Sequence, residues 1–178
     1  YGVQFNKTMY ERLIKDEDIT LFSPSDVPGL YDAFFADQDK FEELYKLYEE
    51  DKDIRKKKIR AVELFSLFMN ERSSTGRIYL QNVDHCNSHS AFDPTVAPIR
   101  QSNLCLEIAL PTKPLTNVDD PDGEIALCTL SAFNLGVIEK LEDLEDTADL
   151  IVRALDGLLS YQDYPVPAAI HSGKRRRT

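Results

Sequence analysis

Three chemically reactive side chains alternate within the segment Asn103-Leu104-Cys105-Leu106-Glu107. In an extended backbone alternate side chains share a face, so the pattern predicts that Asn103, Cys105 and Glu107 point one way and the leucines the other. An amide, a thiol and a carboxylate on a buried face cost free energy unless they are paired or used. Together they offer a hydrogen-bond donor and acceptor, a sulfur that can exchange hydrogen, and an acid or base. The pattern is also typical of a short strand with one polar face toward solvent.

A second thiol, Cys128, lies in the apolar run Ala126-Leu127-Cys128-Thr129-Leu130. A cysteine in such a run is either a small, inert core residue or one half of a redox pair. The redox interpretation requires a partner thiol at close range.

The polar stretch Asp84-His85-Cys86-Asn87-Ser88-His89 contains residue types that bind metals. Structural zinc sites need four ligands at defined spacings, and no second cluster completes a set. We therefore predict a hydrogen-bonded loop and no metal site. The sequence also lacks the glycine-rich phosphate-binding motifs and the GxSxG motif of hydrolases.

Hydrophobic periodicity and turn residues divide the chain into three parts, which together indicate the α/β class. The first part is predicted to be helical and the last to be one amphipathic helix; between them lie short strands and loops. The predicted parts are helical 1–72, strand and loop 77–136, and helix 141–160. Within them we expect helices at 30–35, 38–50 and 59–71, strands at 77–80, 103–110 and 125–130, and a loop at 81–102.

The composition limits the possible functions. The formal net charge is −10, which argues against nucleic-acid binding because that activity needs a basic face. No apolar run reaches the ~20 residues that span a bilayer, so no membrane association is expected. Three cysteines, an odd number, fit a reducing compartment better than a disulfide framework, which favours the cytoplasm.

These segments, taken together, resemble the large catalytic subunit of class I ribonucleotide reductases, and the similarity runs through nearly the whole chain. The block around Cys105 is its most specific part. The matching stretches are 22–24, 27–34, 74–79, 82–87, 101–112, 124–136 and 161–165. Residues 170–174 depart from the family pattern, at no catalytic position.

The resemblance implies a role for each reactive residue. Cys105 matches the cysteine that becomes a transient thiyl radical and abstracts the ribose 3′-hydrogen. Glu107 matches the carboxylate that takes the 3′-hydroxyl proton, Asn103 the amide that binds the ribose hydroxyls, and Cys128 one half of the reducing dithiol. Together with Leu104 and Leu106, Asn103, Cys105 and Glu107 would form the substrate-binding segment.

The family fold that the resemblance implies is a ten-stranded α/β barrel, with the radical cysteine on a loop that enters the barrel. A radical intermediate must be shielded from water, so we expect leucines to cover the site. The expected covering residues are Leu104, Leu106, Leu127 and Leu130. A carboxylate desolvated there should be a stronger base than in water.

The resemblance also implies what this chain would need from elsewhere. Residues 1–178 match a central segment of the catalytic barrel domain. The second active-site thiol, the loop that holds the substrate phosphates and the carboxy-terminal relay residues would lie outside it. The expected partners are a ribonucleoside diphosphate substrate, the rest of the large subunit or a complementary chain, a metal-containing small subunit that supplies the radical, and thioredoxin or glutaredoxin as reductant. No cofactor or metal is expected in this chain itself.

Two other functions remain open from the sequence. The chain could be a truncated, non-catalytic remnant, or one piece of a split subunit that is inactive alone. It could also be a thiol-redox protein of another class, although it has no CxxC motif. The complete set of Asn103, Cys105, Glu107 and Cys128 favours the catalytic segment.

Overall fold

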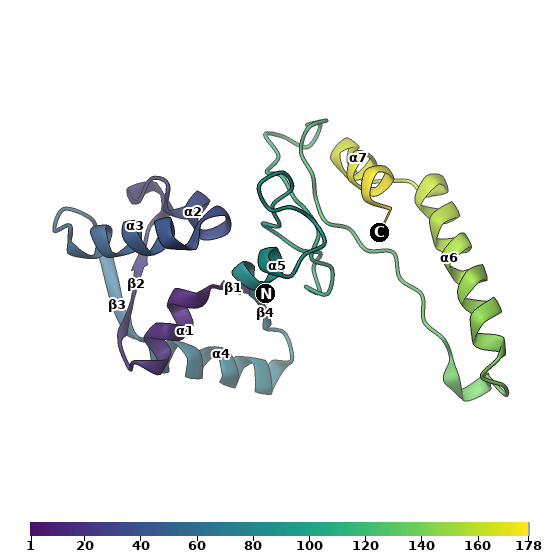
Figure 1. Ribbon diagram of the computed structural model, residues 1–178, viewed down its shortest axis with the longest axis horizontal. Helices are drawn as coiled ribbons and strands as arrows, with labels where there is room; N and C mark the ends of the chain where they lie inside the picture. Colours follow the sequence, from purple (N-terminus) through teal and green to yellow (C-terminus); the bar gives the residue numbers. More distant parts are fainter. Residues whose placement is uncertain (178) are drawn as a thin grey trace.

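The computed structural model describes residues 1–177 and contains short strands and helices in alternation, followed by an irregular region and two final helices (Figure 1). The first elements are β1 (Gly2–Phe5), α1 (Lys7–Ile14), β2 (Asp18–Phe22), α2 (Leu30–Ala36), α3 (Gln38–Glu50) and β3 (Lys56–Arg60). The later elements are α4 (Ala61–Thr75), β4 (Tyr79–Asn82), α5 (Val83–Ser88), α6 (Asp143–Tyr161) and α7 (Pro167–Arg176). Two short 3-10 turns lie at Pro24–Asp26 and Leu135–Val137.

The strands form two separate pairs. β1 pairs in parallel with β4, from Gly2 opposite Tyr79 to Phe5 opposite Asn82. A parallel pair requires a crossover connection, which here contains α1 to α4. β2 and β3 pair antiparallel within that crossover. The α/β class is thus confirmed, whereas residues 1–177 form two two-stranded sheets and do not by themselves display a ten-stranded barrel.

The crossover helices begin and end at residues suited to those positions. Asn6 accepts a hydrogen bond from the Met9 N–H at the start of α1, and Asp37 accepts one from the Lys40 N–H at the start of α3. Gly76 ends α4 with a φ of +66°, in the left-handed region that glycine adopts without steric cost.

Two hydrophobic clusters hold the crossover together. The first lies between α2 and α3, and the second lies where β1, β2 and α4 meet. Their buried members are Val27, Leu30, Ala33, Phe41 and Tyr45 in the first and Phe5, Ile19, Ala61 and Phe65 in the second. The Phe5 and Phe65 rings stack with centroids 4.9 Å apart, which anchors β1 on α4.

A polar network joins α1, β2 and α3 beside these clusters. The Tyr45 hydroxyl accepts a hydrogen bond from the Thr20 N–H at 2.7 Å and donates one to the Thr20 carbonyl at 2.9 Å. The Arg12 guanidinium donates two hydrogen bonds to the Glu49 carboxylate, which also accepts one from the Thr20 hydroxyl. Burial of the Glu49 carboxylate opposes its ionisation, but the hydrogen bonds and charge of Arg12 outweigh burial and lower the pKa of Glu49.

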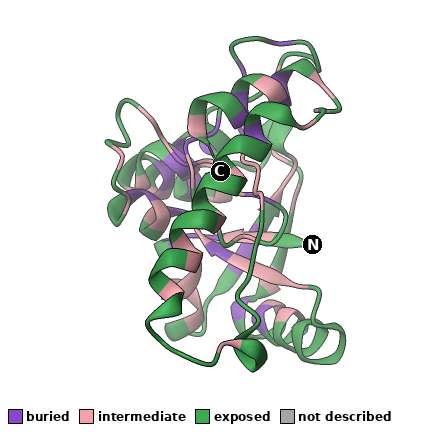
Figure 2. Cartoon of the chain, turned by 90° about the vertical axis from the view of Figure 1, so that its right-hand side faces the viewer, coloured by how far each residue is buried: buried purple, intermediate pink, exposed green. Residues whose placement is uncertain are grey.

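The last third of the chain is less compact. An irregular stretch leads to the long helix α6, which contacts α7 and is exposed along most of its length (Figure 2). The irregular stretch is tied to α7 by the Ile125 N–H, which donates to the Ser172 hydroxyl at 3.0 Å, and by ion pairs from Glu124 to Arg175 and Arg176.

Several sequence predictions differ from the structure. The region 1–72, which was predicted to be helical, contains the strands β1, β2 and β3 as well as its helices. One of these strands, β3, consists largely of charged residues, which are typical of an edge strand. The loop predicted at 81–102 contains α5, and the strand predicted at 77–80 lies at Tyr79–Asn82. The helices at 30–35, 38–50 and 141–160 are confirmed within one or two residues, whereas the helix predicted at 59–71 begins at Ala61 and ends at Thr75.

The Tyr45 hydroxyl generates a stability prediction. Tyr45→Phe leaves the Thr20 N–H and carbonyl without their buried partner. The free energy of unfolding, measured by urea denaturation, should therefore fall by about 1–3 kcal/mol. Tyr48→Phe is the matched control, because the Tyr48 hydroxyl donates to an exposed carbonyl, that of Pro28, which water can serve instead. Equal losses from the two changes would contradict the structural role given to Tyr45.

The Arg12–Glu49 pair generates a pH prediction. Because folding lowers the pKa of Glu49, the pair stabilises the fold above the ordinary glutamate value of 4.5. That contribution should be lost as the pH falls through the lowered pKa of the folded state. The measurement is the free energy of unfolding against pH, compared with that of Glu49→Gln. The parent should lose more stability on acidification than the variant; parallel curves would show that the pair contributes nothing.

Candidate functional site

The site is built on the parallel strand pair. Gln4 and Gln81 are register partners on β1 and β4, and the Gln4 Nε2 donates to the Gln81 Oε1 at 2.8 Å. The same Nε2 group donates to the Arg100 carbonyl at 2.7 Å. The cross-strand amide pair therefore fixes the start of the segment that carries the candidate residues.

Two further buried side chains hold this segment. The Asn87 amide, at the end of α5, accepts a hydrogen bond from the Ile99 N–H at 2.8 Å and donates one to the Ile99 carbonyl at 2.9 Å. The Thr112 hydroxyl accepts hydrogen bonds from the N–H groups of Arg100 and Gln101. Residues 99–101 thus have side-chain partners in place of a neighbouring strand.

The residues predicted to form a strand at 103–110 form a tight turn instead. The Asn103 carbonyl accepts a hydrogen bond from the Leu106 N–H at 3.2 Å, and the Asn103 Oδ1 accepts one from the Ile108 N–H at 3.0 Å. Leu106 has a φ of +66°, which reverses the chain. The strand prediction was wrong because no strand among residues 1–177 lies beside this segment to pair with its backbone.

The turn separates side chains that the alternating pattern placed on one face. Asn103 is buried, with 4% of its surface exposed, whereas Cys105 and Glu107 are exposed. Leu104 is 86% exposed, and so does not cover the site within this chain. Leu106 is half-buried over β1, where a methyl group added to Gly2 would lie 3.6 Å from its Cδ atoms.

Two of the other predicted catalytic side chains, Asn103 and Cys128, influence the ionisation of Glu107. Its pKa is lowered, most strongly by the Asn103 amide, then by its own backbone N–H, and further by a hydrogen bond from the Cys128 thiol. The expectation of a carboxylate made more basic by burial was therefore wrong for this chain: exposure and donated hydrogen bonds keep Glu107 ionised. Cys105 lies two residues before Glu107 at the tip of the same turn.

Cys128 reaches Glu107 from an irregular segment. The strand predicted at 125–130 is not formed; the nearest ladder contact is a single bridge between Lys113 and Glu124. Leu127 and Cys128 are half-buried, whereas Leu130 is 70% exposed and shields nothing. The third thiol, Cys86, is outside this cluster and accepts a hydrogen bond from the Gln81 Nε2 at 3.8 Å.

Two cavities lie near the turn and the strand pair. One, of about 650 Å³, is lined by Gln81, Cys86, Ile99, Leu106 and Ala109, and so lies on the Leu106 side of the turn. The other, of about 770 Å³, lies between α1, α2 and α5 and contains none of the predicted site residues.

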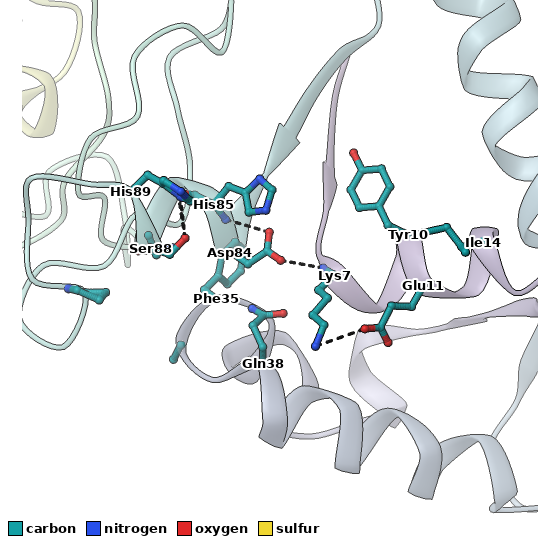
Figure 3. A pocket seen from close by; sticks show the side chains of 13 residues that line it. Lys7, Tyr10, Glu11, Ile14, Phe35, Gln38, Asp84, His85, Ser88 and His89 are labelled. Atoms are coloured by element: carbon teal, nitrogen blue, oxygen red, sulfur yellow. Dashed lines mark hydrogen bonds and ion pairs between the residues drawn. The ribbon is translucent and has the colours of Figure 1, made fainter.

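Figure 3 shows the second cavity, with the α1 side chains facing those of α5 across it. The Asp84 carboxylate accepts hydrogen bonds from the Lys7 N–H and the His85 N–H, both at 2.9 Å. His89 is paired with Ser88. The polar stretch 84–89, predicted to be a loop, is thus mostly helical, and its Asp84 fixes α5 to the start of α1.

Among residues 1–177, no group of three or more histidine, cysteine, aspartate or glutamate side chains is arranged to hold a metal ion. None of the helices within the same residues is both long and apolar enough to cross a bilayer.

These features define an α/β protein whose candidate site consists of thiols, an ionised carboxylate and a buried amide on an irregular loop. The family model described as the ribonucleotide reductase barrel domain matches residues 1–178. The chain belongs to this ribonucleotide reductase family.

Individual relatives agree with the family model. Over all 178 residues the chain is 73% identical to the ribonucleoside-diphosphate reductase subunit alpha of Haemophilus influenzae, and 72% identical to the ribonucleoside-diphosphate reductase 1 subunit alpha of Escherichia coli. It is 53% identical to the subunit alpha of Enterobacteria phage T4 over 99% of its length. The chain spans only 23–24% of the length of these relatives.

The φ of Leu106 generates a prediction about the turn. Glycine adopts this conformation freely, whereas a β-branched residue is strained in it, by about 1–3 kcal/mol. Leu106→Val should therefore open the turn and accelerate hydrogen exchange of the Ile108 N–H by at least about fivefold relative to Leu106→Gly. The two variants share the loss of the leucine contact with Gly2. Equal exchange rates in the two would show that the left-handed backbone at Leu106 is not what holds the turn.

Proposed function

We propose that this chain supplies the hydrogen-abstraction centre of a ribonucleoside-diphosphate reductase. The observation that carries the proposal is the turn closed by Asn103, which holds this buried amide and the exposed Cys105 and Glu107 on one short loop. With Cys128, whose thiol also lowers the pKa of Glu107, these are the residue types that the proposed radical reduction requires, in a chain with 73% identity to such a subunit.

In the proposed reaction the sulfur of Cys105, as a thiyl radical, takes the 3′-hydrogen atom of the ribose and becomes a thiol. Glu107 accepts the 3′-hydroxyl proton, while a thiol of the reducing dithiol protonates the 2′-hydroxyl, which leaves as water. With its lowered pKa, Glu107 is ionised before the reaction, as a proton acceptor must be, and is a weaker base than an ordinary glutamate. The Asn103 amide would donate to a ribose hydroxyl, and its Nδ2 is buried without a partner in good hydrogen-bonding geometry.

Cys128 is proposed as one half of the dithiol that reduces the substrate. Two thiols give up two electrons and two protons and join as a disulfide. The second thiol would come from sequence outside residues 1–178, since Cys86 lies outside the Glu107 cluster. Cys105 would return its hydrogen atom to the 3′-carbon when the product forms.

The remaining components follow from the family. The substrate is proposed to be a ribonucleoside diphosphate, held in part by the rest of the large subunit. A metal-containing small subunit would supply the radical, and thioredoxin or glutaredoxin would reduce the disulfide after each turnover. The leucines around the turn, Leu104 above all, would be covered by the rest of the large subunit and by substrate.

The decisive experiment replaces Cys105. In the complete large subunit with its small subunit and reductant, Cys105→Ser should abolish deoxyribonucleotide formation, because an alcohol O–H is harder to convert to a radical than a thiol S–H. Cys86→Ser is the matched control and should leave turnover near that of the parent. Turnover by Cys105→Ser comparable to the control would remove Cys105 from the mechanism.

A second experiment concerns Glu107. Glu107→Gln keeps the size of the side chain but cannot accept the proton, so kcat should fall by ~10²–10⁴-fold with little change in KM. Steady-state kinetics of the complete enzyme measures both constants. An increase in KM with kcat unchanged would identify Glu107 as a binding residue instead.

A further inference from the structure

The Asn103 amide has two ends with different surroundings. Its Oδ1 accepts a hydrogen bond from the Ile108 N–H at 3.0 Å, and because an N–H can only donate, the atom facing Ile108 must be the oxygen. The Nδ2 end is therefore turned the other way, and it is buried without a hydrogen-bond partner among residues 1–177. The Asn103 amide is also the largest cause of the lowered pKa of Glu107. The orientation of one amide thus links the base of the turn to the candidate proton acceptor.

Ser102 lies next to this amide and contacts both arms of the turn. Its hydroxyl oxygen is 3.0 Å from the Asn103 Oδ1 and 2.8 Å from the Ile108 carbonyl oxygen. A serine hydroxyl has one hydrogen, so it donates to one of the two acceptors at a time. In one rotamer Ser102 donates to Asn103 on the first arm of the turn, and in the other it donates to Ile108 on the second arm.

We propose that Ser102 is a positioning residue for the reaction: with the Ile108 N–H it fixes the Asn103 amide at Oδ1, so that the buried Nδ2 stays free to donate. This inference rests on the proposed function of Asn103 and Glu107. Ser102 itself is half-buried beneath the turn and needs no contact with substrate. If Ser102 loses its hydroxyl, the Ile108 carbonyl loses a hydrogen-bond donor, and the Asn103 Oδ1 is held by the Ile108 N–H alone.

The test compares Ser102→Ala with Ser102→Thr in the complete enzyme. The alanine variant should lower kcat by about three- to tenfold, the value of one net hydrogen bond, with KM for the nucleotide unchanged. Threonine retains a hydroxyl at the same position and should restore kcat.

The pH profile separates positioning from simple stabilisation. The Asn103 amide is the largest cause of the lowered pKa of Glu107. If the amide loses its fixed orientation, that pKa should rise, so the acidic limb of the kcat profile should move to higher pH in Ser102→Ala and stay in place in Ser102→Thr. The Cys128 thiol also lowers the pKa of Glu107, and neither variant alters it. A serine that only stabilised the fold would lower activity without moving this limb.

Asn103→Ala, measured alongside, distinguishes the two possible failures. If Asn103→Ala is as active as the parent, the proposed function of Asn103 fails. If Asn103→Ala is inactive while Ser102→Ala matches the parent in kcat and in the acidic limb, the positioning role of Ser102 alone is overturned. A fall in kcat at all pH values with an unmoved limb also overturns it.

Discussion

Backbone groups that have no neighbouring strand must find other hydrogen-bond partners, and in this chain buried amide side chains supply several of them. Gln4, which also donates to Gln81, holds the Arg100 carbonyl; Asn87 holds both polar groups of Ile99, and Asn103 closes the turn around Cys105. An unpaired buried N–H or carbonyl costs about 1–3 kcal/mol. These amides are therefore what allows an irregular segment to keep one conformation beside the small β1–β4 pair.

The same amides connect structure to chemistry. An amide that accepts with its oxygen has its nitrogen left to donate, so closing the turn at Asn103 leaves a buried donor, Nδ2, free. The same amide is the largest cause of the lowered pKa of Glu107. One residue that is almost completely buried therefore affects both the conformation of the turn and the ionisation of its carboxylate.

Local patterns predicted the helices well and the site segment poorly. The periodicity of 38–50 and 141–160 identified α3 and α6, because an amphipathic helix satisfies its own backbone. The strands predicted at 103–110 and 125–130 do not form. An alternating pattern does not show whether a neighbouring strand is present, and a strand exists only beside a partner. The candidate site residues were predicted from the family resemblance, whereas the left-handed backbone of Leu106, which reverses the chain between Cys105 and Glu107, left no signal in the alternating pattern.

The parallel pairing of β1 with β4 also dictates an order of assembly. The hydrogen bond between Gln4 and Gln81 joins residues 77 apart, and that between Gln4 and Arg100 joins residues 96 apart. Closing loops of this length costs chain entropy, and the favourable energy of the contacts offsets that cost only once they have formed. Such contacts therefore form late and slowly. The crossover helices, whose contacts are local, can condense first. The hydrogen bonds within the thiol-bearing turn are local, but the segment that carries it is anchored to the strand pair only after the chain has closed on itself. The reactive residues therefore take their place beside β1 and β4 after the crossover has formed.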